Sequence, residues 1–220
     1  MRRRSIRETG IRLSLTAVGL VLLQLSNALT LLTTLGADPF HVFLQGLMQC
    51  TGSSYGILYM IVSLLLLVVL LFFRSRPQIG SLLCAFFGGW ILEGFLRLFA
   101  EWIGEELFFP ARLLVVFACC LLQAFGMALL IQSDSGTLPM ELFLRHLSVR
   151  LQKRPYLVIL CCDAVLILAG MLLGGQFGIG TLLLVLLSGL LTGHFMGAAA
   201  QVVKRAVAEE SLLLTFAHLF

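Results

Sequence analysis

Four ionisable side chains lie inside stretches that are otherwise apolar, and they are the residues best placed to do chemistry in this chain. Glu93 and Arg97 are four residues apart in one such stretch, Asp163 follows a Cys-Cys pair in another, and His194 lies in the last. An ionised group at the centre of a membrane helix costs about 2.5 to 3.5 kcal/mol on insertion scales, so each needs a partner or a function. A carboxylate there can bind a proton or a cationic group, and an imidazole can relay protons near neutral pH. We therefore predict that Glu93, Asp163, His194 and Arg97 bind substrate or protons.

Each of these residues also has a purely structural explanation. Glu93 and Arg97 could form an i,i+4 ion pair in which Arg97 reaches out to water. Asp163 could hydrogen-bond to a neighbouring helix, and His194 could pack as a neutral imidazole. The sequence leaves both explanations open, and the choice depends on the elements that carry these residues.

The composition indicates that those elements are membrane-spanning helices. Hydrophobic residues make up 60% of the 220 residues, charged residues make up 12%, and the mean hydropathy is +1.04. A helix needs about 20 mostly apolar residues to cross a bilayer. Six stretches meet or approach this length: residues 13–34, 54–73, 78–98, 112–133, 156–173 and 179–203. The sequence therefore predicts an all-α membrane protein with six transmembrane helices.

The chain also repeats itself at an offset of one hundred residues. Pairing residues 11–100 with 111–200 without gaps gives 18 identities in 90 positions. The residues that recur include glycines and a proline, which have backbone reasons to persist: Gly36 and Gly136, Pro39 and Pro139, Gly80 and Gly180, Gly89 and Gly189. We predict a first repeat over residues 1–110, a second over 111–203, and a cytoplasmic amphipathic tail over 204–220.

Three helices in each repeat have a topological consequence. An odd number of crossings makes the second copy enter the membrane from the opposite face, so the two repeats are predicted to be inverted. Inverted repeats are common in transporters, whose substrate sites lie between the two copies. We expect Gly80, Gly89, Gly180 and Gly189 to allow close helix packing or gating at such an interface.

A short helix is predicted after each recurring proline. Proline suits the first helical position, and Asp38 before Pro39 is a good N-cap. The segment from Pro139 to residue 151, which contains Glu141, has the same plan. Both segments are too short to span a bilayer, so each should lie at the interface or re-enter the bundle. Gly36, Asp38, Pro39, Gly136, Pro139 and Glu141 are therefore predicted as gating or structural residues.

The basic residues assign sides to this topology. With the N-terminus inside, 13 of the 15 Lys and Arg residues fall on the cytoplasmic side, as the positive-inside rule requires, and six crossings return the C-terminus to that side. A cleavable signal peptide is the rival reading of the N-terminal region, but Ala28 and Leu29 recur as Ala128 and Leu129 within an internal helix. Four exposed cations are expected to contact anionic headgroups or a partner: Arg145, Arg150, Lys153 and Arg154.

No residue pattern indicates an enzyme. The chain lacks G-x-S-x-G, H-E-x-x-H and P-loop motifs. Five of the six cysteines lie in apolar runs and none has zinc-site spacing, so we expect no metal and no cofactor. The basic balance is that of a polytopic membrane protein, and we expect no nucleic-acid partner.

Several short motifs resemble a known family. Gly36-x-x-Pro39-Phe40, the Thr-Gly-Ser-Ser of residues 51–54, Arg76-Pro77-x-Ile79-Gly80-Ser81 and the glycine-rich residues 174–181 are similar to those of the YczE/YyaS/YitT group of bacterial membrane proteins, most of all the YczE branch. The chain departs from the group where Pro39 is followed by Phe40-His41 and Pro139 by Met140-Glu141. The resemblance implies a polytopic, transporter-like protein.

Together these observations predict a bacterial inner-membrane transporter or permease for an unidentified small solute. The alternative is a non-transporting partner or regulatory subunit that acts through its basic cytoplasmic face, or a lipid-handling protein. A homodimer or another membrane partner is compatible with either.

Overall fold

The computed structural model describes residues 6–75, 77–103 and 107–217, and within 209–217 only the backbone. All regular secondary structure in this part of the chain is helical. The helices are α1 (Ile6–Leu32), α2 (Pro39–Thr51), α3 (Tyr55–Phe72), α4 (Ile79–Phe99), α5 (Phe109–Ser133), α6 (Pro139–Leu151), α7 (Pro155–Leu172) and α8 (Ile179–Ala217). Six of them, all except α2 and α6, are long and apolar enough to cross a membrane. The prediction of an all-α polytopic membrane protein is confirmed.

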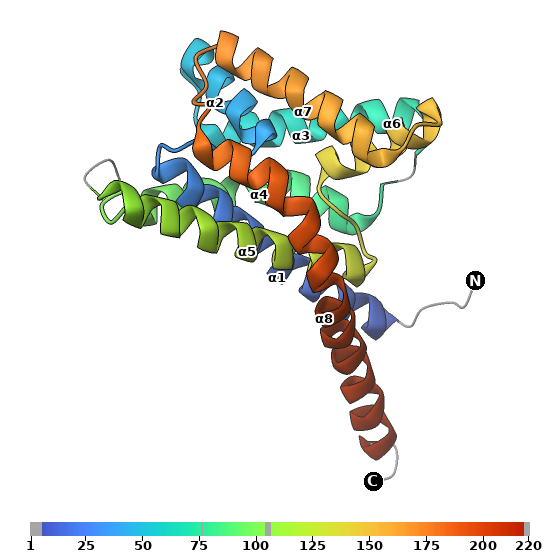
Figure 1. Cartoon of the computed structure of the whole chain (residues 1–220). Coiled ribbons are helices and arrows are strands. Elements are labelled where there is room, and N and C mark those ends of the chain that lie inside the picture. The colour runs from blue at the N-terminus through green and yellow to red at the C-terminus, as the bar shows by residue number, and fades with distance from the viewer. Residues whose placement is uncertain (1–5, 76, 104–106, 218–220) are drawn as a thin grey trace.

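The end of the chain differs from the prediction. A separate tail was expected after residue 203, but α8 continues without a break to Ala217. Residues 198–217 contain neither glycine nor proline, so nothing in the backbone ends the helix there. The last part of α8 projects away from the other helices (Figure 1).

Helices α1 and α5 cross closely at the middle of the bundle. Gly19 of α1 lies against Gly126 of α5, so that a Cβ on Gly19 would lie 3.0 Å from the Gly126 carbonyl oxygen. Ser26 Oγ donates a hydrogen bond to the carbonyl oxygen of Cys119 at 2.8 Å. Helix α4 packs on α1, and α8 packs on α5, so the crossing pair is covered by one helix from each part of the chain.

The third helices of the two parts pack differently. Helix α3 lies along α4 in close contact, whereas α7 has almost no contact with α8. Figure 1 shows α7 and α8 diverging from the connector that joins them. Helix α7 is held mainly by the short helix α2, and the short helix α6 packs against α3 and α7.

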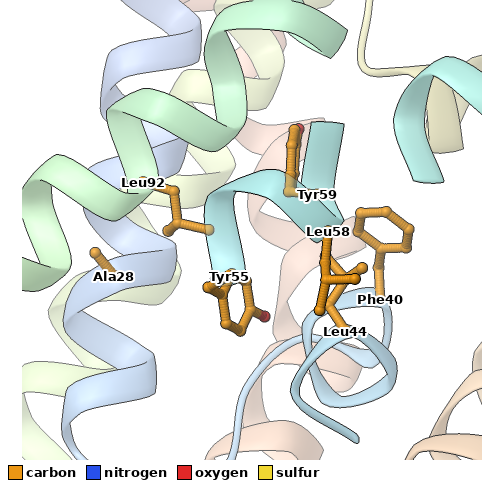
Figure 2. Packing of buried hydrophobic residues seen from close by; sticks show 7 residues of the cluster. All are labelled: Ala28, Phe40, Leu44, Tyr55, Leu58, Tyr59 and Leu92. Carbon is orange, nitrogen blue, oxygen red and sulfur yellow. The ribbon is translucent and has the colours of Figure 1, made fainter. Parts of the chain in front are cut away.

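Helix α2 lies inside the bundle, not on its surface. Its first four residues, Pro39 to Val42, are all buried. Figure 2 shows Phe40 and Leu44 of α2 packed beside Leu58 and Tyr59 of α3. Of the two predicted placements for this helix, the structure therefore favours re-entry. Helix α6 is less enclosed, with Pro139, Leu144 and Ser148 buried.

The turn before each short helix accepts a hydrogen bond from the first turn of a long helix in the other repeat. Gly36 and Gly136 have φ angles of 106° and 142°, which favour glycine. The backbone N–H of Gly180 donates to the carbonyl oxygen of Leu35 at 2.8 Å, and that of Gly80 donates to Ser135 at 2.9 Å. The first turn of α8 is thus tied to the turn before α2, and the first turn of α4 to the turn before α6.

Candidate functional site

A cavity of about 250 Å³, which we name the large chamber, lies among α5, α7, α8 and the starts of α2 and α6. Its polar lining comes from Asp38, Gln123, Glu141, Asp163, Ser188 and Thr192. Its apolar lining includes Phe40, Met127, Met140, Leu144, Ile159 and Leu166. Among its lining residues there are three carboxylates and no Lys or Arg, so the chamber is strongly acidic.

A second cavity of about 60 Å³, the small chamber, lies next to the first. The two chambers share six lining residues: Asp38, Phe40, Gln123, Met127, Met140 and Glu141. The small chamber adds His41, Asn27, Tyr59 and Ser63. We name the two chambers together the central cavity, since they share six lining residues.

The central cavity lies where α2 and α6 begin. Both helices have proline in their first turn. Asp38 is the N-cap of α2 and accepts a hydrogen bond from the Phe40 backbone N–H at 3.2 Å, as predicted. The N-terminus of a helix carries a partial positive charge, and Asp38 and Glu141 compensate it at α2 and α6 respectively. Both short helices therefore begin at one cavity.

Asp38 also holds His41. Its Oδ2 atom lies 2.5 Å from His41 Nδ1. The His41 side chain is stacked on Tyr55 with ring centroids 6.0 Å apart, and the whole residue is 3% exposed. His41 Nε2 is buried and has no hydrogen-bond partner in the described structure. In the neutral tautomer that donates Nδ1–H to Asp38, this Nε2 is a free acceptor.

Glu141, which lies outside the six candidate spans, has a strongly perturbed pKa. Burial raises its pKa to about 7, the charge of Asp38 adds to the rise, and the cation Arg145 opposes it. Glu141 can therefore gain and lose a proton near neutral pH. Asp163 of α7 lines the same large chamber, so three carboxylates from α6, α7 and the start of α2 share one space.

Gln123 of α5 adds a further polar atom to this space. It lines both chambers, and its Oε1 atom is buried without a hydrogen-bond partner in the described structure. A buried acceptor without a donor costs about 1 to 3 kcal/mol. The central cavity therefore holds two acceptors that lack a donor, Gln123 Oε1 and His41 Nε2 in the tautomer above.

The structure separates Glu93 and Arg97 from this cavity. Glu93 Oε2 accepts the backbone N–H of Gly56 at 3.0 Å, and Glu93 Oε1 accepts Arg97 Nη2 at 3.1 Å. The Arg97 side chain is 78% exposed. Glu93 thus accepts a hydrogen bond from the first turn of α3 and forms an ion pair with Arg97, whose side chain extends to the surface. Neither residue lines either chamber.

His194 also lies elsewhere. It is exposed on α8 and makes an edge-to-face contact with Phe195, with ring centroids 5.8 Å apart. It does not line the central cavity, so the structure does not bring it to Asp163. Of the four intramembrane candidates, Asp163 alone lines the cavity.

The sequence predicted Asp38 and Glu141 as gating or structural residues, and it did not single out His41 or Gln123 as site residues. A signal for His41 was present. His41 and Glu141 occupy equivalent positions of the repeat, each two residues after its proline. Both residues line the small chamber, where α2 and α6 begin.

Two sequence differences between the repeats explain why the large chamber lies on one side only. Gly56 allows α3 to approach α4, where a Cβ would lie 2.6 Å from the Gly89 carbonyl oxygen, but the position equivalent to Gly56 holds Tyr156. Gly189, the equivalent of Gly89, has open space beside it and lines the chamber.

The second difference concerns the space itself. Tyr59 of α3 packs against Gly88 of α4, where a Cβ would lie 2.7 Å from the Tyr59 ring. The equivalent of Tyr59 is Ile159, whose smaller side chain lines the large chamber. Tyr59 lines the small chamber, so its ring narrows in the first repeat the space that stays wider beside Ile159 in the second.

The four predicted cations lie at the C-terminal half of α6 and in the connector to α7. Arg145, Arg150, Lys153 and Arg154 are exposed, and the Arg150 guanidinium lies 4.6 Å from the centroid of the Phe73 ring. They form a surface separate from the central cavity, which we name the basic surface. In the described residues, no group of three His, Cys, Asp or Glu side chains is arranged to hold a metal ion.

Comparison with known proteins places this architecture in a family. Over 189 aligned residues the chain is 28% identical to the uncharacterized protein YyaS of Bacillus subtilis (strain 168), covering 81% of this chain and 89% of that protein. No solved structure matches the chain. Residues 10–197 match a family of unknown function, DUF6198. The chain is therefore a polytopic membrane protein that belongs to the DUF6198 family, in agreement with its resemblance to the YczE/YyaS group.

Proposed function

We propose that this protein is a transporter that moves a small polar solute through the central cavity. The observation that carries the proposal is the position of Asp38, Glu141 and Asp163, which line one space inside a bundle of six candidate membrane helices. Ionisable residues at such a depth mark substrate and proton pathways by default. The volume of about 250 Å³ lies just below the range of about 300 to 1,000 Å³ typical of drug-sized ligands, which suits a small solute.

The proposal includes two inverted repeats, residues 11–100 and 111–200. If a two-fold axis relates the repeats, each contact between two residues recurs between the two residues at the equivalent positions, one hundred residues away. The hydrogen bonds from Gly80 to Ser135 and from Gly180 to Leu35 form such an exchanged pair. Gly19 against Gly126 and Ser26 with Cys119 form another at the α1–α5 crossing. These contacts support the inverted arrangement, in which one repeat rocks against the other around a central site.

The different packing of α3 and α7 indicates where the large chamber opens to the outside of the bundle. The large chamber adjoins the divergence between α7 and α8, while α3 is closed on α4. In the proposed cycle, movement of α7 with α2 relative to α8 opens and closes the large chamber. The Gly170 backbone contacts α2 directly, since a Cβ there would lie 2.7 Å from the Val42 carbonyl oxygen, so α2 and α7 are suited to move as one unit.

The proposed location is the bacterial cytoplasmic membrane with both ends of the chain in the cytoplasm. Arg12 contacts Ser133 at the end of α5, and Gln132 contacts Met196 of α8. The start of α1 and the second half of α8 therefore leave the bundle at one end, as an even number of crossings requires. In this orientation α2 enters from the outer side and α6 from the cytoplasmic side.

Reconstitution tests this function. Purified protein in liposomes is placed under an imposed pH gradient, and uptake of radiolabelled amines, carboxylates, sugars and amino acids is recorded. Wild type should show saturable uptake of at least one class, and Asp163→Asn should abolish it. Glu93→Gln is the matched control and should retain it. Absence of saturable uptake with every panel, or uptake unchanged in Asp163→Asn, would overturn the proposal.

A second candidate function rests on the basic surface. Four exposed cations on one short helix and its connector fit a partner with an acidic surface or an anionic membrane. A regulatory subunit of this kind requires Arg150, Lys153 and Arg154 but not Asp163. Reversing these three charges should remove a co-purifying partner, while Asp163→Asn should leave it bound.

A lipid-handling role is favoured by a different space. An apolar pocket of about 340 Å³ lies among α2, α3, α6 and α7 and is lined by Phe40, Phe43, Met140 and Phe143. Co-purified phospholipid that is lost when Phe143 is changed to a polar residue would support this role over solute transport.

A further inference from the structure

We infer that the solute of the central cavity is a small primary amine, bound in its protonated form. This inference rests on the proposed function and names its substrate class. It follows from the kind of polar atoms that line the cavity, from the two that lack partners, and from the shape of the apolar walls.

The carboxyl groups that line the central cavity are not balanced by any Lys or Arg. Asp38, Glu141 and Asp163 present carboxyl groups, and the lining of the two chambers contains no Lys or Arg. A buried cluster of carboxylates is stable only if some groups are protonated or a cation joins them. A cationic solute supplies the missing charge at the moment it binds.

Two buried acceptor atoms without a hydrogen-bond partner indicate that the cation must be a hydrogen-bond donor. His41 is 3% exposed, lines the small chamber, and has a buried Nε2 without a partner. Gln123 Oε1 is also buried without a partner and lines both chambers. Both are acceptors when His41 donates through Nδ1 to Asp38, so the ligand needs several N–H donors. A primary ammonium group has three, whereas a quaternary ammonium has none.

The remaining lining suits an alkyl chain. Phe40, Met140, Ile159 and Leu166 provide apolar contacts beside the carboxylates. A metal ion would leave these walls unused, and no group of three suitable ligands exists among the described residues. An anion is disfavoured, since the lining offers it no Lys or Arg and places carboxyl groups beside it.

The same arrangement implies exchange with protons. Glu141 faces Asp38 and His41 of the α2 region and Asp163 of α7, with Arg145 one turn further along its own helix. When the ammonium enters, its positive charge favours loss of the proton from the Glu141 carboxyl group. That proton leaves to water, and it returns when the amine departs. One cation therefore replaces one proton, and the charge of the cavity is unchanged.

A matched set of four-carbon probes tests the inference: n-butylammonium, tetramethylammonium, n-butanol and butyrate. Purified full-length protein in nanodiscs is melted with each, followed by the fluorescence of Trp90 and Trp102. n-Butylammonium should raise the melting temperature in a saturable manner, since a ligand that binds only the folded state stabilises it. The other three should give little or no shift. An equal or larger shift with tetramethylammonium, n-butanol or butyrate would overturn the assignment.

Three variants locate the site. Asp163→Asn and Glu141→Gln should each weaken n-butylammonium binding by roughly 10-fold or more, because each removes a charged acceptor. Glu93→Gln should bind as wild type does. The wild-type affinity should also rise with pH through about 7, where Glu141 loses its proton. Equal weakening in all three variants, or an affinity that is independent of pH, would contradict the inference.

Failure of the transport function and failure of the amine assignment give different results. If n-butylammonium binds but no flux occurs in liposomes, the ligand class is supported and the transport function is rejected. If another solute class is transported and no amine binds, the transport function is supported and the amine assignment is rejected.

Discussion

Arg12 and Arg112, one hundred residues apart, make the same contact at opposite ends of the α1–α5 pair. Arg12 Nη1 donates to the carbonyl oxygen of Ser133 at 3.1 Å, and Arg112 Nη1 donates to that of Thr33 at 3.4 Å. Each guanidinium thus satisfies a carbonyl at the C-terminal end of the other helix, where cations are favoured. The exchange requires α1 and α5 to run antiparallel, as the first helices of two inverted repeats must.

Labelling of equivalent loop positions tests the inverted topology. Ser53 and Lys153 occupy the same place in the repeat, each just after a residue in the left-handed conformation that ends a short helix. In a Cys50→Ser background, Ser53→Cys should react with an impermeant maleimide added outside whole cells. Lys153→Cys should react only after the cells are permeabilised. Labelling of both cysteines from one side would contradict the inverted arrangement.

Equivalent glycines of α4 and α8 should respond differently to alanine. A Cβ on Gly89 would clash with the Gly56 backbone, and overpacking of this kind costs about 1 to 3 kcal/mol. Gly89→Ala should therefore lower the melting temperature in detergent. Gly189→Ala has open space and should melt within a degree or two of wild type, as should the control Gly94→Ala. Gly189→Ala should instead reduce flux, because it narrows the large chamber. A stable Gly89→Ala would show that α3 and α4 do not depend on this contact.

A tyrosine at position 159 should fill the large chamber. Tyr59 occupies the equivalent space between α3 and α4, so Ile159→Tyr copies into the second repeat what the first already contains. We expect a folded protein whose flux and n-butylammonium binding are reduced at least 10-fold. Leu160→Tyr adds the same ring at the next residue, which is also exposed but does not line the large chamber, and should retain both. Retained flux in Ile159→Tyr would place the solute route elsewhere.

The stability of the protein should depend on pH through Glu141. The folded protein holds this proton up to about pH 7, whereas an ordinary glutamate releases it near 4.5. Between these values the folded state binds more protons than the unfolded state, so the free energy of unfolding falls as the pH rises. At about 1.4 kcal/mol per pH unit, the upper limit of this loss is about 3 kcal/mol.

Glu141→Gln should remove that part of the pH dependence. Denaturation midpoints in detergent, measured from about pH 5 to about pH 8, should fall with pH in wild type and change less in the variant. Glu93→Gln serves as the control and should follow the wild-type slope. Parallel slopes in wild type and Glu141→Gln would mean that Glu141 is not shielded from water.

Much of the fold could be predicted because its signals are local or periodic. Long apolar stretches identify membrane helices wherever they pack, and proline with a preceding Asp38 marks the start of α2 from backbone chemistry alone. The predicted and observed bounds of α6 agree at both ends, residues 139–151. The prediction ended the last transmembrane helix at residue 203, whereas α8 continues to Ala217, since charged residues do not end a helix.

The site depended on contacts between remote segments, and here sequence reasoning was only partly right. Glu93 and Asp163 look alike as acids in apolar helices. Glu93, however, meets the first turn of α3 because Gly56 allows α4 to approach. Asp163 lines a cavity because α7 has almost no contact with α8, and the position equivalent to Gly56 holds Tyr156. The sequence by itself determined the helices, the repeat and the two helix starts at Pro39 and Pro139. Only the tertiary structure decided that Asp38, His41, Gln123, Glu141 and Asp163 share one cavity, since a common space depends on how distant helices pack and not on what each of them contains.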